Sequence, residues 1–293
     1  MEKVTIENIN LSLAHPDELN LRWVGQDDLV RQLLACWFVE NDNDYPLNPR
    51  LLGKPGVGKT TLAYTAATML KRPVYLFQAT MDTRPEDLII TPVIGQNNSI
   101  QYVASPLVTA MIKGGVCILD EGNRMSEKAW ASLAPLLDTR RYVESIIAGI
   151  KVPAHKDFRI CVTMNEDSST YELPEYIHSR LQPQIYIDFP ERDEELLILR
   201  HNLSHAPEEV LEYIADFLQL AHKADEVYTV RDGINIGRYA LKTLNCGYEL
   251  NFFNNQPQYA SSETDSMGNK KYSAAIKNAV KMVLGDEGLN YAR

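Results

Sequence analysis

The chain has 293 residues, of which 45% are hydrophobic and 23% charged, and its net charge at neutral pH is −10. These values are ordinary for a globular protein and allow one large domain or two modest ones. The acidic balance argues against a broad nucleic-acid surface, because such surfaces use Lys and Arg to neutralise phosphates. No apolar run approaches a membrane span, and the start, Met-Glu-Lys-Val-Thr, lacks a signal peptide's apolar core, so we expect a cytoplasmic protein with no membrane partner.

The cysteines and histidines do not suggest a metal site. The four cysteines are widely spaced, form no Cys-x-x-Cys pair, and are expected to be reduced: Cys36, Cys117, Cys161 and Cys246. His201 and His205 stand four residues apart, but no Glu follows His201 and no third ligand is evident, which indicates an exposed helix end.

The first predicted elements frame a glycine-rich loop. Within residues 21–40, apolar residues recur at the spacing of a helix with one buried face, at Leu29, Leu33, Leu34, Trp37 and Phe38. Residues 50–52 and 73–77 each read as a short buried strand. Between them lie the loop and a helical sequence, so this region is expected to form a strand-loop-helix-strand unit.

Strands and helices continue to alternate as far as Pro190. Residues 87–106 predict a hairpin turning at 95–98, and a second hairpin is expected around Ala148-Gly149. Continuous apolar strands are predicted at 116–119 and 158–164. This alternation favours a parallel sheet with helices on both faces.

The sequence changes character after Pro190. Three amphipathic helices without strand patterns predict a small helical domain, so we expect an α/β domain at 1–190 and a helical one at 191–293. A polar, turn-rich stretch at 251–271 reads as a loop. The last predicted helix has Tyr272, Ile276 and Val280 on one face and ends at Gly285.

The glycine-rich loop has the spacing of a phosphate-binding loop. Gly53, Gly58, Lys59 and Thr60 fit the pattern Gly-x4-Gly-Lys-Thr, in which glycines let backbone N–H groups surround phosphate oxygens at a helix N-terminus. We expect Lys59 to reach the β- and γ-phosphates and the Thr60 hydroxyl to hold Mg²⁺.

Polar residues follow two of the predicted strands. Asp120 and Glu121 end the first, and Asn165 ends the second. Buried parallel strands bring such residues to the carboxyl edge of the sheet, where α/β proteins bind ligands. We therefore expect Asp120 to hold Mg²⁺ with Thr60, Glu121 to polarise an attacking water, and the Asn165 amide to hydrogen-bond both the γ-phosphate and that water.

Two arginines are candidates for phosphate contacts outside the loop. Arg180 follows a short predicted helix, and a guanidinium there would stabilise charge that develops during phosphoryl transfer. Thr229 and Asp232 have the spacing of a capping box, which puts Arg231 in the first turn of a helix. A cation there opposes the helix dipole, and a nearby phosphate would offset this cost.

Together these motifs resemble the AAA+ ATPases, in particular the MoxR-like branch with an insert in the second core helix. The resemblance covers about residues 20–245 and rests on "WVGQ", "GKPGVGKT", "PEDL", "ILDEGNR", "HSR" and "VRDG" in this order. It implies a P-loop three-layer α/β sandwich followed by a helical lid, a hexameric homo-oligomer, use of ATP and Mg²⁺ to remodel partners, and partners that carry a von Willebrand factor A domain.

The resemblance also assigns roles to residues. Asn165 corresponds to sensor 1, Arg180 to the arginine finger and Arg231 to sensor 2. Nucleotide contacts are implied for the adenine-side motif and the Walker A loop, namely Gly25, Gln26, Gly53, Pro55, Gly56, Val57, Gly58, Lys59, Thr60 and Thr61. The chain departs from the family pattern in having Glu166 after Asn165 and Leu181 after Arg180. Arg124, Arg140 and Arg141 are rival cations for the finger.

The sequence favours an ATP-hydrolysing protein-remodelling subunit over two alternatives. A nucleic-acid motor is possible for this fold but is disfavoured by the net charge. A small-molecule phosphotransferase would use the same loop, but the Asp-Glu pair, the two hairpins and the arginine of the lid count against it. The chain lacks the Asn-Lys-x-Asp motif that reads guanine, so ATP is expected rather than GTP.

Overall fold

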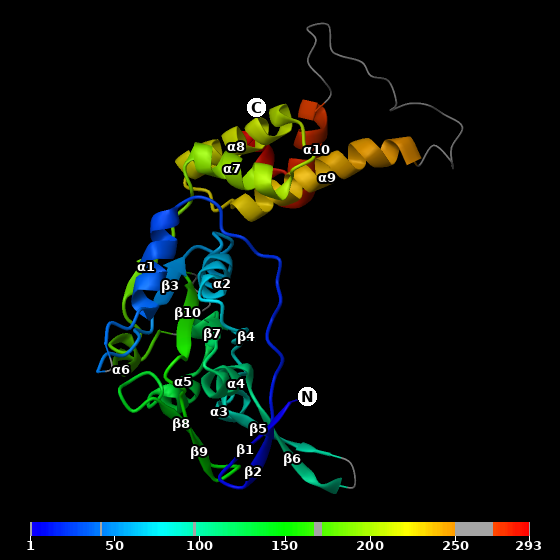
Figure 1. Ribbon diagram of the computed structural model, residues 1–293. Coiled ribbons are helices and arrows are strands. Elements are labelled where there is room, and N and C mark those ends of the chain that lie inside the picture. The colour runs from blue at the N-terminus through cyan, green and yellow to red at the C-terminus, as the bar shows by residue number, and fades with distance from the viewer. Residues whose placement is uncertain (1, 42, 96–97, 167–171, 250–271, 293) are drawn as a thin grey trace, which may run out of the picture. The chain divides into compact units, whose positions relative to one another are not determined.

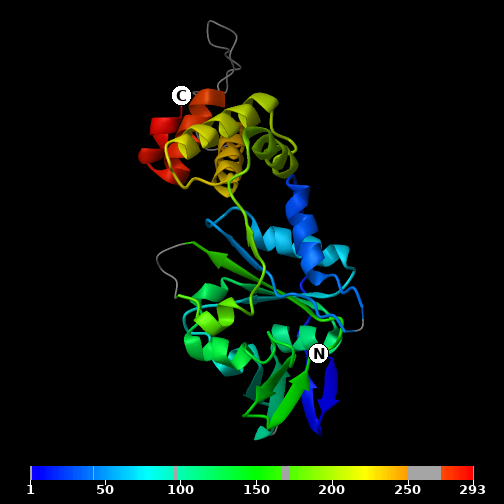
Figure 2. The same ribbon diagram turned by 90° about the vertical axis from the view of Figure 1, so that its left-hand side faces the viewer.

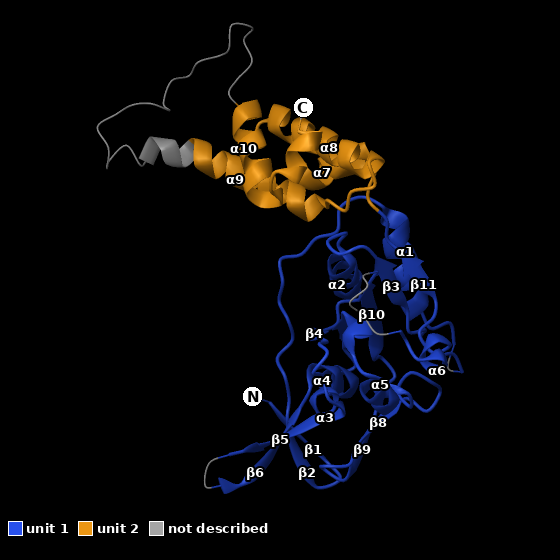
Figure 3. Cartoon of the chain, turned by 180° about the vertical axis from the view of Figure 1, so that it is seen from behind, with its two compact units in different colours: residues 1–188 blue, residues 189–293 orange. Residues whose placement is uncertain are grey.

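The computed structural model describes residues 2–41, 43–95, 98–166, 172–249 and 272–292. They form two compact units, residues 1–188 and residues 189–293 (Figure 3). The predicted loop at 251–271 and residues 96–97 of the first predicted hairpin turn lie outside the described residues.

A five-stranded parallel sheet is the centre of the first unit. Its strands are β3 (Arg50–Gly53), β4 (Val74–Gln78), β7 (Val116–Asp120), β10 (Arg159–Asn165) and β11 (Gln184–Tyr186), in the spatial order β11-β3-β10-β7-β4. Asn165 is paired with Gly53, and Asp120 with Gln78. The register therefore brings the ends of β3, β7 and β10 to one edge of the sheet, as the sequence predicted.

Helices cover both faces of this sheet because its strands alternate their side chains between two cores. Val116 and Ile118 of β7 pack with α1 (Asp27–Trp37) and α2 (Lys59–Met69). Cys117 and Leu119 of the same strand pack with α4 (Pro106–Lys113) and α5 (Glu127–Leu133). Figure 2 shows the two pairs of helices on opposite sides of the sheet. The predicted α/β sandwich with a parallel sheet is confirmed.

The buried face of α1 differs in part from the predicted one. Its buried residues are Val30, Leu33, Cys36 and Trp37. Phe38 is 70% exposed, because it follows the last helical residue and has an extended backbone, which turns its side chain off the helix face.

Two smaller sheets lie at the end of the first unit beside α4 and α5 (Figure 1). One has the order β1-β2-β6-β5 and consists of β1 (Lys3–Ile6), β2 (Ile9–Ser12), β5 (Ile90–Ile94) and β6 (Ile100–Ala104). The other is the hairpin of β8 (Tyr142–Ser145) and β9 (Ile150–Pro153). Both internal hairpins were predicted, and α3 (Pro85–Leu88) precedes the first. The N-terminal hairpin was not predicted.

The second unit is helical. It contains α7 (Arg192–Asn202), α8 (Glu208–Lys223), α9 (Val230–Glu249) and α10 (Tyr272–Leu284), followed by a short 3₁₀ helix, η4 (Glu287–Tyr291). Gly233 and Gly237 let α9 lie close to its neighbours, because a Cβ atom on either would come within 3 Å of Leu218 or Leu203. Gly285, with φ of +80°, follows α10 as predicted. Among the described residues, no helix is both long enough and apolar enough to cross a membrane.

Candidate nucleotide site

The loop between β3 and α2 needs glycine at its two ends. Gly53 has φ of +151°, and a Cβ atom there would lie 2.2 Å from the backbone oxygen of Ile187. Gly58 has φ of +96°, and its Cβ would lie 3.0 Å from a ring carbon of Trp23. Only glycine combines these backbone angles with so close an approach. The loop therefore presents bare backbone at the N-terminus of α2, which suits a phosphate group.

Lys59, the first residue of α2, is a buried cation of this loop. Its side chain is only 6% exposed, and Nζ donates to the backbone oxygens of Gly53 and Lys54, at 2.8 Å each. An ammonium group is costly to bury unless oxygens surround it. The loop thus keeps a positive charge beside the backbone N–H groups that would face phosphate.

Asp120 joins the P-loop helix to the two central strands. Thr60 Oγ1 donates to Asp120 Oδ1 at 2.8 Å, and the Thr163 hydroxyl of β10 donates to the same oxygen. Thr163 Oγ1 in turn accepts the backbone N–H of Glu121 at 3.1 Å. A hydroxyl and a carboxylate are hard oxygen donors of the kind that Mg²⁺ takes. Thr60 and Asp120 therefore fit this ion, which would neutralise phosphate charge.

Glu121 has an uncommon backbone conformation at the end of β7. Its φ of 55° and ψ of 40° place a residue other than glycine in the left-handed region, a strained state that is frequent at functional sites. Both carboxylate oxygens accept hydrogen bonds, Oε1 from Asn165 Nδ2 at 3.1 Å and Oε2 from Arg124 Nε at 2.5 Å. Two of the predicted catalytic side chains are therefore in direct contact.

Asn123, which the sequence reading did not single out, supports Asn165. Its Nδ2 atom donates to the backbone oxygen of Asn165 at 2.7 Å, while its Oδ1 atom is buried without a hydrogen-bond partner. The residue belongs to a short 3₁₀ turn, η2 (Gly122–Arg124), directly after Glu121. It thus ties the end of β10 to the turn after β7.

The "WVGQ" segment lies against the phosphate loop. Gly25 and Gln26 both have positive φ, 79° and 44°, and Gln26 is the residue before α1. Trp23 is anchored through its backbone N–H to Thr65 Oγ1 of α2 at 2.9 Å, and its ring contacts the position that a Cβ of Gly58 would occupy. Of the other predicted loop residues, Pro55 is exposed, whereas Gly56, Val57 and Thr61 are half-buried.

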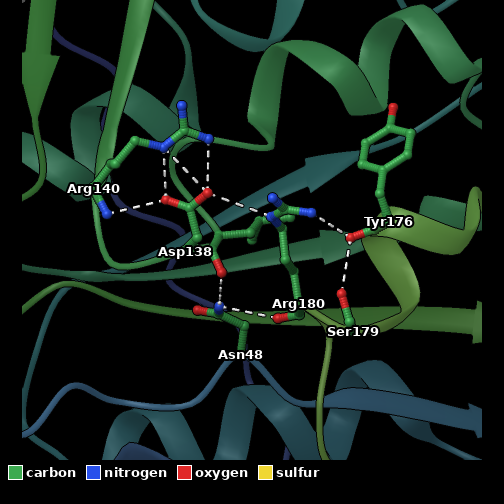
Figure 4. Close-up of polar contacts among 7 residues, drawn as sticks. Asn48, Asp138, Arg140, Tyr176, Ser179 and Arg180 are labelled. Carbon is green, nitrogen blue, oxygen red and sulfur yellow. Dashed lines mark hydrogen bonds and ion pairs between the residues drawn. The ribbon is translucent and has the colours of Figure 1, made fainter.

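Arg180 contacts a different set of residues. It lies just after α6 (Glu175–His178), and its Nε atom is 3.4 Å from Asp138 Oδ2 (Figure 4). Its Nη1 atom donates to the backbone oxygen of Tyr176 at 2.6 Å. Arg140 also binds Asp138, and hydrogen bonds from Arg140 are the main reason why the pKa of Asp138 is lowered to about 2.

The rival arginines have different surroundings. Arg124 is paired with Glu121 of the same chain. Arg141 is half-buried, donates to the backbone oxygen of Phe158 at 3.0 Å and lies over its ring, and burial lowers its pKa. Arg140 is the most exposed of the ion-paired candidates, with 51% of its side chain accessible.

Arg231 belongs to the second unit. The backbone N–H of Thr229 donates to Asp232 Oδ2 at 2.8 Å, and that of Asp232 donates to Thr229 Oγ1 at 3.4 Å, so the predicted capping box is present. Arg231 is exposed in the first turn of α9. The structure thus brings Lys59, Thr60, Asp120, Glu121 and Asn165 together in the first unit, and Arg231 lies in the other.

Comparison with known proteins agrees with this geometry. Residues 50–181 match the family model of the AAA domain, dynein-related subfamily. This segment of the chain is therefore similar to an AAA domain. Domains of this kind generally hydrolyse nucleotides. The matched segment runs from β3 to the residue after Arg180, and so includes the loop, Asp120, Glu121 and Asn165.

Relatives and solved structures extend the likeness beyond that segment. The chain is 25% identical over 180 residues to an uncharacterized protein of Staphylococcus epidermidis, a match that covers 59% of this chain and 68% of that protein. An uncharacterized protein of Staphylococcus aureus is 27% identical over 156 residues, a match that covers 51% of this chain and 59% of that protein. In fold, the chain resembles the RuvB Holliday junction branch migration motor of Thermotoga maritima, with a TM-score of 0.53 and 17% identity. This match covers 88% of this chain and 76% of the RuvB chain. The chain also resembles the FIGL-1 AAA domain in complex with ADP, with a TM-score of 0.55 and 15% identity. This match covers 94% of this chain and 89% of the FIGL-1 chain.

Proposed function

We propose that this AAA protein is a Mg²⁺-dependent ATPase of the MoxR-like branch that remodels partner proteins. The observation that carries this proposal is the cluster of Thr60, Asp120, Glu121 and Asn165, joined by hydrogen bonds beside a glycine-lined phosphate loop. A loop of this kind alone would serve many phosphate-binding proteins. A carboxylate held against a strand-end amide adds what hydrolysis requires, a group that orients water.

Each residue of the cluster has a role in this proposal. The loop N–H groups and Lys59 hold the β- and γ-phosphates of ATP, and Thr60 and Asp120 hold Mg²⁺. Glu121 accepts a proton from the attacking water, and Asn165 orients that water or the γ-phosphate. The "WVGQ" segment provides Gly25 and Gln26 on the adenine side.

The proposed active assembly is a cytoplasmic ring, a hexamer by the family resemblance. In this ring Arg180 acts on ATP bound by the neighbouring copy, because it makes its contacts with Asp138 and Tyr176 and not with the P-loop cluster of its own chain. Arg231 of the helical lid senses the nucleotide. By the same resemblance, the partner is a protein that has a von Willebrand factor A domain.

The exposed tips of the two internal hairpins support a protein partner over nucleic acid. Residues 88–105 contain no charged side chain, and Ile94 and Ile100 at the hairpin end are 83% and 67% exposed. In the β8-β9 hairpin, Ile146 is 93% exposed. Nucleic-acid contacts depend on Lys and Arg, whereas exposed aliphatic side chains suit apolar segments of a polypeptide. ATP hydrolysis stimulated by DNA or RNA would favour the motor alternative.

Mixing two inactive variants tests the proposal. Lys59→Ala should fail to bind ATP, and Arg180→Ala should bind ATP but hydrolyse it slowly, since a guanidinium supplied across an interface is worth about 10³ to 10⁵ in rate in related systems. In a mixed ring, some interfaces combine an intact Lys59 with an intact Arg180. Partial recovery of ATPase activity on mixing is therefore expected.

The mixture has a built-in control and a clear negative outcome. The control is the double variant with both substitutions. Mixed with either single variant, it forms no interface that combines an intact Lys59 with an intact Arg180, so ATPase activity should not recover. Specific activity of the parent protein should rise with concentration as rings form. If mixed rings form and no activity returns, or if a monomer hydrolyses ATP at full rate, Arg180 does not act in trans.

A further inference from the structure

Asp138 lies between two arginines and belongs to neither the phosphate loop nor the Walker carboxylates. We propose that Asp138 is a positioning residue that presents Arg140 and Arg180 together, as one two-guanidinium unit, to the phosphate groups of ATP held by a neighbouring copy. This inference rests on the proposed trans role of Arg180 and extends it in two ways. It makes Arg140 a second phosphate contact and not a rival, and it assigns a role to a carboxylate.

The contacts of Asp138 fix the plane of the Arg140 guanidinium. Arg140 Nε lies 3.0 Å from Oδ1, and Nη2 lies 2.7 Å from Oδ2, which is a two-point pairing. The backbone N–H of Arg140 also donates to Oδ1 at 3.0 Å. A bidentate pair of this kind restricts orientation more than a single contact does. Arg140 is therefore held in one direction although half of its side chain is exposed.

The same carboxylate reaches Arg180 from the other side. Arg180 Nε is 3.4 Å from Oδ2, the oxygen that Arg140 Nη2 also contacts. The Nη1 atom of Arg180 is fixed by the backbone oxygen of Tyr176, and the guanidinium lies 5.9 Å from the centre of the Tyr176 ring. Within the described residues, no partner is recorded for Nη2 of Arg180. Figure 4 shows both guanidinium groups beside the one carboxylate.

A buried amide holds the two backbone segments of this cluster in place. Asn48 is 8% exposed, and its Nδ2 atom donates to the backbone oxygens of Leu137 at 2.9 Å and Arg180 at 3.2 Å. These oxygens belong to the residue before Asp138 and to Arg180 itself. The spacing between the carboxylate and Arg180 is therefore set by the fold and not only by flexible side chains.

The charge balance of the cluster favours an anion. Two guanidinium groups share one carboxylate, so the cluster keeps an excess positive charge. An exposed ion pair contributes little to stability, which makes a purely stabilising role a weak explanation for three converging groups. Two fixed guanidinium planes suit a group with several oxygens, since Arg binds phosphate through paired N–H donors. ATP on a neighbouring copy is such a group in the proposed ring.

Asp138→Asn tests this positioning role, because it keeps the shape of the side chain and removes its charge. At saturating ATP and ring-forming concentrations of the full chain, we expect kcat to fall about tenfold, while KM for ATP stays within twofold because each copy binds ATP through its own loop. Asp138→Glu should recover part of the rate. The matched control is Asp157→Asn, which removes a carboxylate 3.1 Å from Arg72 Nη2 and should leave kcat unchanged.

A double-mutant cycle separates positioning from general damage. Asp138→Asn should have a smaller effect in the Arg180→Ala protein than in the parent, because only Arg140 is then left for the carboxylate to position, and Arg140→Ala alone should lower kcat. Assembly of rings driven by ADP with aluminium fluoride should weaken in Asp138→Asn. An unchanged or higher kcat in Asp138→Asn, or full additivity with Arg180→Ala, would overturn the inference even if the mixing experiment succeeds. A parental rate in Arg180→Ala itself would instead refute the trans role on which the inference rests.

Discussion

The carboxylate of Glu121 lies 2.5 Å from the Nε atom of Arg124, three residues along the chain, and its other oxygen accepts a hydrogen bond from Asn165 at 3.1 Å. Two neighbouring groups thus fix the orientation of a side chain whose backbone is already in the left-handed region. Such fixation costs conformational freedom, and it is useful where one oxygen must meet a water molecule at a defined place. It is therefore consistent with Glu121 as the group that activates water.

Glu121→Gln should separate ATP binding from hydrolysis. The amide keeps the size of the side chain and can still accept a hydrogen bond, but it cannot take a proton from water. We expect kcat to fall by about 10² to 10⁴, the usual contribution of a general base, with ATP affinity nearly unchanged. Binding of a fluorescent ATP analogue and single-turnover hydrolysis measure the two quantities. Glu40→Gln, at an exposed position, is the control, and a parental rate in Glu121→Gln would remove Glu121 from the mechanism.

Gly53→Ala should damage the phosphate loop through a steric contact with the segment that follows β11. Its Cβ would lie 2.2 Å from the backbone oxygen of Ile187, so the segment after β11 must move. Gly149→Ala is a matched control, since Gly149 also has positive φ, 65°, but nothing lies within 4 Å of its Cβ position. We expect Gly149→Ala to lower the free energy of unfolding by about 1 kcal/mol and Gly53→Ala to lower it by roughly 2–3 kcal/mol more. Only Gly53→Ala should lose ATP binding. Thermal unfolding followed by tryptophan fluorescence measures the stability of each variant. Equal losses of stability in Gly53→Ala and Gly149→Ala would contradict the predicted steric contact.

Arg231→Ala should weaken the binding of ATP more than that of ADP if the exposed guanidinium at the start of α9 contacts the γ-phosphate. A ligand shifts a conformational equilibrium only through a contact that differs between the two states, and ADP lacks the group that would make this one. We expect a fivefold or greater rise in Kd for ATP, on the order of 1 kcal/mol, and little change for ADP. Arg238→Ala, an exposed arginine two turns further along α9, is the control. Equal losses for both nucleotides would exclude the contact.

The parts of the site that were predicted are those that local sequence defines. Gly53 to Thr60 are contiguous, and Asp120, Glu121 and Asn165 follow apolar strands whose parallel pairing brings their ends to one edge. The supporting residues were missed because their partners are far away in sequence. Thr163 is 43 residues from Asp120, and Asn48 is 132 residues from Arg180.

The N-terminal hairpin was missed for a different reason. Residues 3–6 and 9–12 form two four-residue strands with many polar side chains, which gives too short an alternation to be distinguished from a polar coil. They are strands because β2 pairs with β6, more than eighty residues later in the sequence, and Leu11 is completely buried in the resulting core. This pairing is tertiary information that the local pattern does not contain.

A buried acid in the helical unit gives that unit its own dependence on pH. Glu195 of α7 is completely buried, accepts a hydrogen bond from Gln219 Nε2 at 3.0 Å through Oε2, and has no hydrogen-bond partner for Oε1. The ring nitrogen Nδ1 of His222 lies 3.7 Å from Oε1. Burial raises the pKa of Glu195 from 4.5 to about 7, because the charged form is poorly solvated there.

The helical unit should therefore lose stability as pH rises from about 4.5 to 7. In this range the folded state keeps a proton on Glu195 that the unfolded state has released, so unfolding releases a proton and is favoured at higher pH. The full cost, present above pH 7, is about 3 kcal/mol. Glu195→Gln has no such proton and keeps an acceptor for Gln219, so at pH 8 it should protect amides of α7 and α8 from hydrogen exchange more strongly than the parent, with the difference vanishing near pH 4.5. Amides of β7 and β10 in the same samples are the control, and an equal ratio of parent to variant protection at every pH would refute the role of Glu195.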